Sequence, residues 1–403
     1  MNFQFETIII GAGPAGLFTA LNSKISDKTL ILEKNQSAGK KLLMSGAGRC
    51  NLTQFGNIRD FFSHYGDNHR FLIPALNEFT NYDLMNFFNN HGLKTINIKS
   101  KIFPETENSE DVLDILLHEC MKKKVKINYD ESVKSIELIN DGFAISANNY
   151  DYISKNLVIA TGGKSYPTSG SNGDGYQFAK ATGHTVIKPK PALTPVYISN
   201  YKFKEISGIS LGERKITVMR DNLKIKIHQG DIGFTHWGLS GPGILDLSRF
   251  IEANDVLKIN LINQNPEIFR EMLNETAITD GKRTIKRFLK NFTIPENLIK
   301  LLLDQMNLET SVAISSISKI IRNRLVEIFC EYPFHVQRTG DFNIAMVTAG
   351  GISLKEVNPK TMESKLVKNL YFVGEVLDID GDTGGFNLQA AFSTAFLAAK
   401  NLS

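Results

Sequence analysis

The chain has 403 residues, of which 42% are hydrophobic and 22% charged, and its formal net charge is +4. This length excludes one simple core, and the balance is that of an ordinary globular protein, so we expect two or three domains. Three distant cysteines, Cys50, Cys120 and Cys330, exclude a disulfide framework and favour a reducing cytoplasm. No C-x-x-C or Cys/His cluster indicates a metal, no apolar run reaches membrane-spanning length, and the first predicted strand leaves no room for a signal peptide.

The chain opens with an apolar, β-branched run, Thr7 to Ile10, that leads directly into a G-x-G-x-x-G motif. In such a turn the first glycine permits the sharp bend, the second admits a pyrophosphate, and the third lets the helix pack on the strand. A second short strand, at 29–32, ends in an acid placed to accept hydrogen bonds from a ribose. We therefore predict an α/β, Rossmann-type dinucleotide site whose first cofactor contacts are Gly11, Gly13, Pro14, Ala15, Gly16, Glu33 and Lys34.

A segment rich in glycine, cations and side-chain donors follows at 39–51. Such a loop can wrap a diphosphate and bring backbone N–H groups to the edge of a flavin ring, although its composition also suits a surface loop. The cofactor contacts expected here are Lys41, Leu42, Ser45, Gly46, Gly48, Arg49 and Asn51.

The next elements alternate between helical and strand patterns. In chain order we expect helices at 81–91 and 109–123, a small meander of strands at 125–129, 133–138, 143–147 and 151–153, a buried strand from 156 to 159, and a helix from about 174 to 182. Cys120 falls on the apolar stripe of its helix and is interpreted as a core residue. Small residues after the buried strand would let the backbone pass close to a cofactor. The contacts predicted from this region are Val133, Thr161, Gly162 and Gly163.

The pattern changes at a proline-rich stretch, 188–192, after which 193–262 resembles strands and 266–330 resembles helices. We interpret this part as an insertion and divide the chain into an N-terminal part of a FAD-binding domain (1–190), an inserted β subdomain (191–264), an inserted helical subdomain (265–340) and the C-terminal part of the FAD-binding domain (341–403). Within the insertion, 230–242 contains His236 beside Trp237, the only tryptophan. This stretch is either a wall of the substrate site or a structural corner.

The inserted helical part contains a basic segment in which apolar side chains share one face. Its cations are either a solvated helix face or a patch that contacts the phosphates of a nucleic acid. They are Lys282, Arg283, Lys286, Arg287 and Lys290.

Near its end the chain returns to a strand, 369–373, that ends in Gly374-Glu375, and a glycine-rich turn then leads into the last helix. The acid can bind ribityl hydroxyls, and the helix N-terminus can stabilise negative charge on a reduced flavin. These roles favour FAD over NAD. No second G-x-G-x-x-G motif is present, so a nicotinamide cofactor would have to bind through other contacts. The C-terminal cofactor contacts expected are Gly374, Glu375, Asp380, Gly385, Asn387, Leu388 and Gln389.

The sequence resembles the BaiN/RdsA-like bacterial flavoproteins across essentially the whole chain. The resemblance rests on the opening glycine motif, the Ser-Gly-x-Gly-Arg-Cys-Asn block and the segments 39–51, 234–242, 348–351 and 374–389. It implies a FAD domain split by an insertion and an NAD(P)- and FAD-dependent oxidoreductase. Family activities include reduction of unsaturated bile-acid intermediates, reduction of a uridine in ribosomal RNA to dihydrouridine, and an amine-oxidase assignment.

Both reductions add hydride to a C=C bond conjugated to a carbonyl and then a proton at the neighbouring carbon, so they require a carbonyl donor and a proton source. Cys50 is either that proton donor or a small hydrophobe packed near the flavin. His236 is a second candidate, as donor or carbonyl polariser, and Tyr166 a third. An RNA reductase, a small-molecule enone reductase, an amine oxidase and a non-catalytic flavin-binding protein stay open, with NAD(P)H the expected reductant of either reductase.

Overall fold

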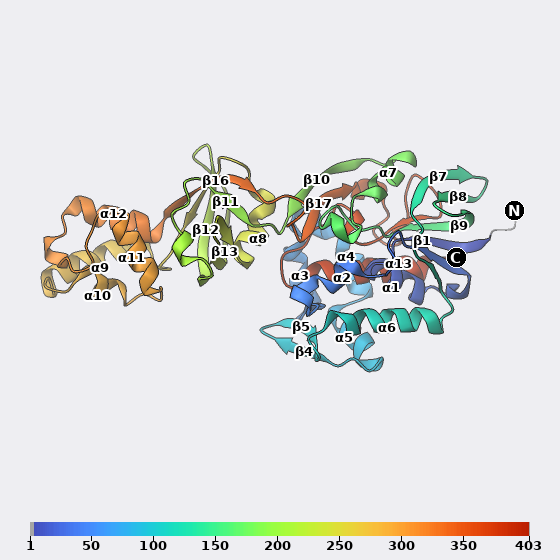
Figure 1. The fold of residues 1–403 in the computed structure, drawn as a ribbon, viewed down its shortest axis with the longest axis horizontal. Coiled ribbons are helices and arrows are strands. Elements are labelled where there is room, and N and C mark those ends of the chain that lie inside the picture. The colour runs from blue at the N-terminus through green and yellow to red at the C-terminus, as the bar shows by residue number, and fades with distance from the viewer. Residues whose placement is uncertain (1–3, 403) are drawn as a thin grey trace. The chain divides into compact units, whose positions relative to one another are not determined.

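A computed structural model describes residues 4–402 of the chain. The chain folds into two compact units. The first combines the residues up to Ala192 with those from Phe342 onward, and the second is the inserted stretch Leu193–Asp341 (Figure 1).

The first unit is built on a seven-stranded sheet of order β6-β2-β1-β9-β8-β7, with β18 also paired to β9. Its centre is parallel, and its strands there are almost fully buried because helices cover the sheet. β7 and β8 are antiparallel. The strand bounds are β1 Phe5–Ile10, β2 Thr29–Leu32, β6 Lys126–Asn128, β7 Val133–Ile139, β8 Gly142–Ala147, β9 Asp151–Ile159 and β18 Leu370–Phe372.

Two expectations about this sheet were wrong. The strand expected at 125–129 is not part of the meander, because β6 pairs in parallel with β2 at the sheet edge. The strands expected at 151–153 and 156–159 form one continuous strand, β9. The first part of β9 pairs with β8 and its last part with β18, while β1 lines its other side. A strand that changes partner along its length gives no break in its own sequence.

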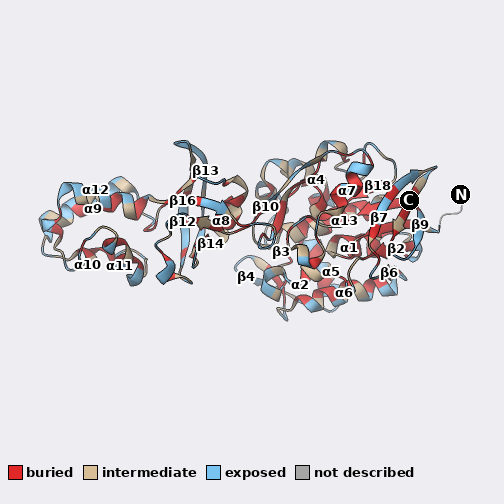
Figure 2. Ribbon diagram, turned by 45° about the horizontal axis from the view of Figure 1, so that its top comes forward, coloured by how far each residue is buried: buried red, intermediate tan, exposed pale blue. Residues whose placement is uncertain are grey.

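Helices pack on this sheet through an aromatic core. The ring of Phe18, on α1, lies 5.0–5.1 Å from the rings of Phe79, Phe87 and Phe392. Cys120 is buried on α6, as expected. Figure 2 shows buried residues along the strands and on the inner sides of these helices. The helix bounds are α1 Pro14–Asn22, α2 Lys40–Leu43, α3 Ile58–Phe61, α4 His69–Glu78, α5 Asn81–Asn90, α6 Ser109–Lys122, α7 Asp174–Ala181 and α13 Phe386–Asn401.

Two smaller sheets complete the first unit. One contains three short antiparallel strands, β3 Thr53–Gln54, β5 Lys101–Pro104 and β4 Thr95–Ile98. The other is an antiparallel ribbon of β10, Val186–Ala192, with β17, Val347–Ile352. β10 leads toward the insertion and β17 follows it, and the ribbon pairs Ala192 with Val347.

The second unit contains a closed barrel of order β11-β14-β13-β12-β15-β16. β16 falls inside 265–340, the range assigned to the helical subdomain, but after the helical pattern expected at 266–330, and it completes the barrel, because Phe334 and Val336 alternate with exposed residues as in a half-buried strand. The barrel and the helices share one hydrophobic core, and the subdomain boundary at 264 stays a prediction. The bounds are β11 Val196–Ile198, β12 Ser210–Arg220, β13 Leu223–Phe234, β14 Gly238–Ser240, α8 Pro242–Leu247, β15 Val256–Ile259, α9 Pro266–Thr279, α10 Ile285–Leu289, α11 Glu296–Asp304, α12 Lys319–Cys330 and β16 Tyr332–Thr339.

Candidate dinucleotide site

The turn between β1 and α1 has the geometry of a phosphate cradle. A Cβ atom on Gly11 would lie 2.6 Å from the carbonyl oxygen of Ala160, and one on Gly16 would lie 1.9 Å from that of Gly11. Around Gly13, by contrast, no atom lies within 4 Å of the Cβ position. Gly11 and Gly16 are therefore required for packing, while Gly13 faces open space in front of the helix. Pro14 is at the first turn and no side chain caps the helix, so its first N–H groups are available to an anion.

Glu33 lies directly beside this turn at the end of β2 and is buried. One carboxylate oxygen accepts a hydrogen bond from Ala12 N at 2.8 Å, and the other accepts from the backbone and side-chain nitrogens of Asn35 at 2.9 and 2.7 Å. These bonds fix the carboxylate at the position expected of the ribose-binding acid. Its contact with a ribose stays a prediction.

Segments that are far apart in the sequence meet in a second cluster around Glu375. Lys41 Nζ donates to Glu375 Oε2 and to Ser165 Oγ, each at 2.7 Å. Glu375 Oε1 accepts from Ser165 Oγ at 3.0 Å and from Thr348 N at 2.9 Å. A Cβ atom on Gly163 would lie 2.4 Å from Thr348 Oγ1, so only glycine fits there. Sequence reasoning selected Lys41, Gly163 and Glu375 but missed Ser165, whose signal was its position two residues after the predicted small-residue turn.

The segment 39–51 is more ordered than the loop expected. It forms α2 and a short 3-10 helix, Ser45–Gly48, and several of its residues have left-handed backbone conformations. The Arg49 side chain packs against the three-stranded sheet, with its guanidinium carbon 5.0 Å from the ring centre of Phe103 on β5. One of its guanidinium nitrogens lies 3.6 Å from a carboxylate oxygen of Glu107. Leu42 is buried and its carbonyl accepts a hydrogen bond from Ser45 Oγ.

Cys50 is fully buried, and burial raises the pKa of its thiol to about 12. Its backbone N–H donates to Ser45 O, and its φ of 57° is left-handed, an uncommon conformation for any residue other than glycine. A general acid works best with a pKa near the working pH. The burial therefore favours the interpretation of Cys50 as a packed small hydrophobe over that of a proton donor.

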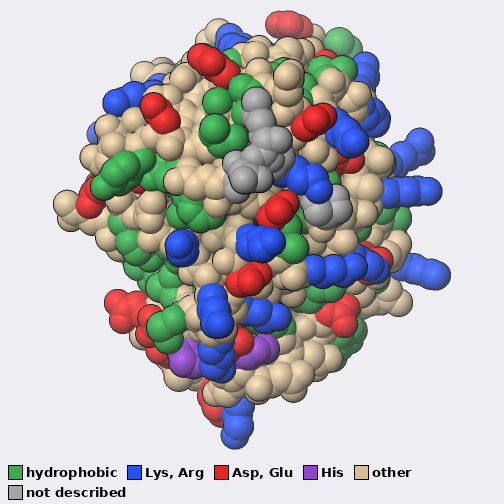
Figure 3. Space-filling view, turned by 90° about the vertical axis from the view of Figure 1, so that its right-hand side faces the viewer, with side chains coloured by type: hydrophobic (Ala, Val, Ile, Leu, Met, Phe, Trp, Pro, Cys, Tyr) green, Lys and Arg blue, Asp and Glu red, His purple; other side chains and the backbone are tan. Residues whose placement is uncertain are grey.

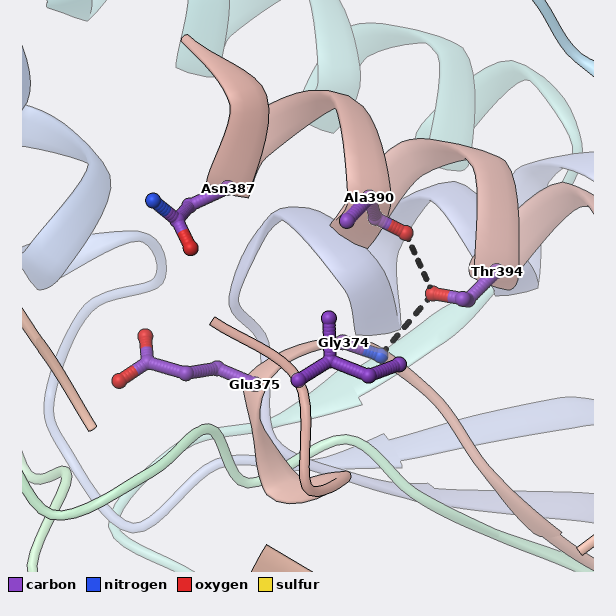
Figure 4. Close-up of a pocket in the computed structure, with 6 residues that line it drawn as sticks. Gly374, Glu375, Asn387, Ala390 and Thr394 are labelled. Carbon is purple, nitrogen blue, oxygen red and sulfur yellow. Dashed lines mark hydrogen bonds between the residues drawn. The ribbon is translucent and has the colours of Figure 1, made fainter. Parts of the chain in front are cut away.

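The C-terminal half-site surrounds a small pocket at the start of α13, lined by Gly374, Glu375, Ile379, Asn387, Ala390 and Thr394. Figure 4 shows Glu375 and Asn387 extending to the same side of it, away from Thr394. The N–H of Gly374 donates to Thr394 Oγ1 at 3.0 Å, which holds the strand end against the helix. Gly385, with φ of 97°, precedes the helix.

Two predicted contacts have other partners here. The side chain of Gln389 is fully buried and donates to Phe79 O and Ser393 Oγ, so it points into the core rather than lining the pocket. Lys34 Nζ lies 2.6 Å from Asp174 Oδ2 and 2.8 Å from Asn172 Oδ1. The Asp174 carboxylate, at the start of α7, neutralises the charge of Lys34. Both contacts with a cofactor stay predictions.

The remaining predicted residues lie on the expected elements. Val133 begins β7 and is buried, Thr161 follows β9, and Leu388 is partly buried on α13. Tyr166 follows Ser165 in a left-handed conformation, and its N–H donates to Phe342 O. His236 belongs to the other unit, where it is exposed.

Sequence reasoning missed an acid–histidine pair next to α13. His64 Nδ1 lies 3.0 Å from Asp382 Oδ2, and the imidazole stacks on the ring of Phe386 with centres 4.1 Å apart. Tyr65 fixes the same residue by donating from its hydroxyl to Phe386 O at 2.8 Å. The pair joins residues 318 positions apart, so no local spacing indicates it.

The basic segment of the insertion is partly neutralised. Ile285, Phe288 and Leu289 are buried, and the side chains of Lys286 and Lys290 both contact Glu296. Elsewhere the charge is mixed: on the face drawn in Figure 3, acidic and basic side chains are interspersed. Within residues 4–402, no group of His, Cys, Asp and Glu side chains suits a metal ion, and none of the helices is both long and apolar enough to cross a membrane.

The parallel sheet, the glycine turn and the acid after the second strand define a Rossmann-type dinucleotide-binding protein. The chain belongs to the HI0933-like family, whose Rossmann-domain model matches residues 5–401. It is 35% identical over 414 residues to a ribosomal RNA dihydrouridine synthase of Haemophilus influenzae, covering 100% of both chains. It is 29% identical to a 3-dehydro-bile acid Δ4,6-reductase of Clostridium scindens, covering 97% of both.

Among solved structures, a 3-ketosteroid-Δ4-(5α)-dehydrogenase from Rhodococcus jostii shares the fold, with a TM-score of 0.52 at 12% identity over 99% of this chain and 98% of that one. The protein is thus a FAD-dependent oxidoreductase, as the sequence resemblance implied. The expectation of a Rossmann-type domain carrying a β-rich insertion is confirmed.

Proposed function

We propose that this enzyme reduces a C=C bond conjugated to a carbonyl, with a uridine of ribosomal RNA as substrate and dihydrouridine as product. The observation that carries the proposal is the 35% identity to the Haemophilus influenzae synthase over the full length of both chains. A uracil ring contains the required bond, since its C5=C6 is conjugated to the C4 carbonyl. An RNA substrate of this kind would place the protein in the cytoplasm.

The residues of the first unit fit FAD. The open space at Gly13 and the uncapped start of α1 suit its diphosphate, the fixed Glu33 suits the adenosine ribose, and Glu375 with Asn387 suits the ribityl and ring end. When bound, FAD supplies the hydride. The task of the protein is then to bind the flavin, exclude water and deliver a proton to the substrate carbon.

We assign the reductant as NAD(P)H. The chain has no second glycine fingerprint, so the nicotinamide would bind only long enough to reduce the flavin and then leave. For the proton, the buried Cys50 is the weakest of the three candidates, and Tyr166 and His236 are preferred because both have access to solvent.

The basic residues of 282–290 are proposed RNA contacts. Because Glu296 already binds Lys286 and Lys290, the cations left for phosphates are chiefly Lys282, Arg283 and Arg287. Of these, Arg283 also donates to Asn291 Oδ1.

A second candidate is the reduction of a soluble enone, which the 29% identity to the Clostridium scindens reductase supports. It uses the same bond type and the same flavin chemistry. The two proposals differ only in what carries the conjugated carbonyl.

The test uses holoenzyme under anaerobic conditions. The flavin absorbance should bleach with NADH or NADPH, and subsequent addition of ribosomal RNA that lacks dihydrouridine should restore it, with dihydrouridine detected by mass spectrometry of the digested RNA. Restoration by a steroid enone but not by RNA would favour the second candidate. A flavin that bleaches only with an amine and forms peroxide in air would instead identify an oxidase.

A further inference from the structure

An aromatic and cationic stack lies on the surface of the inserted barrel. The Arg338 guanidinium carbon lies 3.6 Å from the centre of the Tyr197 ring, and the Trp237 ring lies 4.1 Å from that same centre at an angle of 18°. Because both groups lie so near the centre of the Tyr197 ring, they must be on opposite faces of it. The strand register agrees, because β11 lies between β16 and β14. Tyr197 pairs with Arg338 of β16 on one side and with Gly238 of β14 on the other. The three groups therefore form a row.

The backbone of Trp237 is held firmly in a hairpin turn. The Thr235 hydroxyl accepts from the N–H groups of Trp237 and Gly238, and the Trp237 carbonyl accepts from Ile198 N at 3.2 Å. A Cβ atom on Gly238 would lie 2.0 Å from Val196 O, so glycine alone lets the turn approach β11. The indole is thus positioned before any ligand arrives.

This stack is not part of the hydrophobic core. Neither Tyr197 nor Trp237 is among the described side chains packed in the core of this unit, and Trp237, at the end of the row, is 36% exposed. Its neighbour His236 and the far member Arg338 are also exposed. A partly exposed aromatic ring whose backbone is fixed can receive a flat ligand at little entropic cost.

We propose that Trp237 is a stacking platform for an unpaired base of single-stranded RNA, with Arg338 available to the phosphates. The proposal rests on the proposed function, which makes RNA the ligand. Every base has a π face that can stack on an exposed aromatic ring, and small β-barrels with surface aromatics and cations bind single strands in this way. Arginine adds both charge and stacking to such a site.

The first test uses the fact that Trp237 is the only tryptophan. Holoenzyme is titrated at fixed low salt with a ten-nucleotide oligouridylate, while indole fluorescence and the anisotropy of a labelled copy of the RNA are followed. We expect saturable quenching that tracks the anisotropy, and none with inorganic polyphosphate, which has charge but no base. Bound RNA that leaves the indole fluorescence unchanged would overturn the proposal.

The second test compares variants. Trp237→Ala should weaken oligouridylate binding at least about five-fold, whereas Trp237→Phe, which keeps a ring, should change it less than about two-fold. Tyr150→Ala is the matched control, since Tyr150 is 66% exposed in the other unit. Thermal unfolding shows whether each variant is folded. Equal affinities for the Ala and Phe variants would overturn the platform.

The outcome is separable from that of the proposed function. If ribosomal RNA is reduced by wild type and by Trp237→Ala with the same KM, the platform is wrong and the function stands. If wild type forms no dihydrouridine in ribosomal RNA, the function is wrong, and the fluorescence titration reports independently on base stacking.

Discussion

Lys41 Nζ lies 2.7 Å from Glu375 Oε2, although the two residues are 334 positions apart. One belongs to the N-terminal and the other to the C-terminal part of the nucleotide-binding unit, and the whole insertion lies between them in the sequence. Both side chains are mostly buried, at 24% and 18% exposure. The pair therefore couples the two halves of the site, and the Ser165 hydroxyl joins it.

Replacement of Lys41 by Met should weaken this coupling. Loss of one partner leaves a poorly solvated carboxylate, so we expect a loss of about 1–3 kcal/mol in the free energy of unfolding and a higher Kd for FAD. Lys122→Met is the matched control, because Lys122 pairs with Glu119 but is 56% exposed, and it should cost about 1 kcal/mol or less. Denaturant unfolding and flavin fluorescence measure the two effects, and equal losses in both variants would contradict this view.

The glycines of the opening turn should separate folding from binding. Gly16→Ala forces a Cβ into a backbone oxygen and should destabilise the protein by several kcal/mol. Gly13→Ala has no such clash and an ordinary φ of −80°, so the apoprotein should be nearly as stable as wild type but bind FAD at least about ten-fold more weakly. Thermal melts of apoprotein with FAD titrations check both. Normal FAD affinity in Gly13→Ala would mean that the open space is not the diphosphate site.

Cys50 should contribute to stability at neutral pH and lose that contribution at high pH. Burial raises the pKa of its thiol to about 12, so the folded state holds the proton that the unfolded thiol releases near pH 9. Stability from this group is complete below about pH 9 and falls as pH rises toward 12, by about 1.4 kcal/mol per pH unit. Cys50→Ala should therefore show a shallower decline in unfolding free energy over this range.

The same variant tests catalysis. Cys50→Ala should keep FAD and a near-normal kcat, since a packed thiol takes no part in proton transfer. A kcat reduced by a factor of about 100 or more with bound FAD intact would restore Cys50 as the proton donor.

Glu296 should limit RNA binding by the basic segment. Glu296→Gln frees Lys286 and Lys290, so affinity for RNA should rise. The slope of log affinity against log salt concentration should become steeper by about one to two units, one for each cation that gains a phosphate. Lys282→Ala with Arg287→Ala should have the opposite effect. Filter binding at several salt concentrations measures both slopes. Unchanged slopes would show that the segment is only a solvated helix face.

Local signals in the sequence predicted the nucleotide-binding unit well, because a strand, a glycine turn and a terminal acid are contiguous. The same holds for α6 and α13, whose apolar stripes and turn residues are local. β6 was misplaced for the opposite reason: whether a short strand pairs with its successor or crosses to β2 depends on contacts formed only in the folded sheet.

The site was predictable only in part. Glycine and acid motifs indicated Gly163 and Glu375, but nothing near His64 shows that Asp382 will meet it. Gln389 was assigned to the cofactor because it follows the glycine turn, yet helical geometry turns its side chain toward Phe79. Spacing along the chain therefore predicts which segment reaches the site more reliably than which side chain faces it.

The β10–β17 ribbon has a consequence for how such an enzyme could arise. Because Ala192 is paired with Val347, the chain leaves and re-enters the nucleotide-binding unit at neighbouring positions. A short hairpin of about two to five residues would close that gap, so the ribbon can accommodate inserted domains of different length at the same place. Exchange of the stretch between these two paired positions would replace the second unit while leaving the paired strands of the first unit in place.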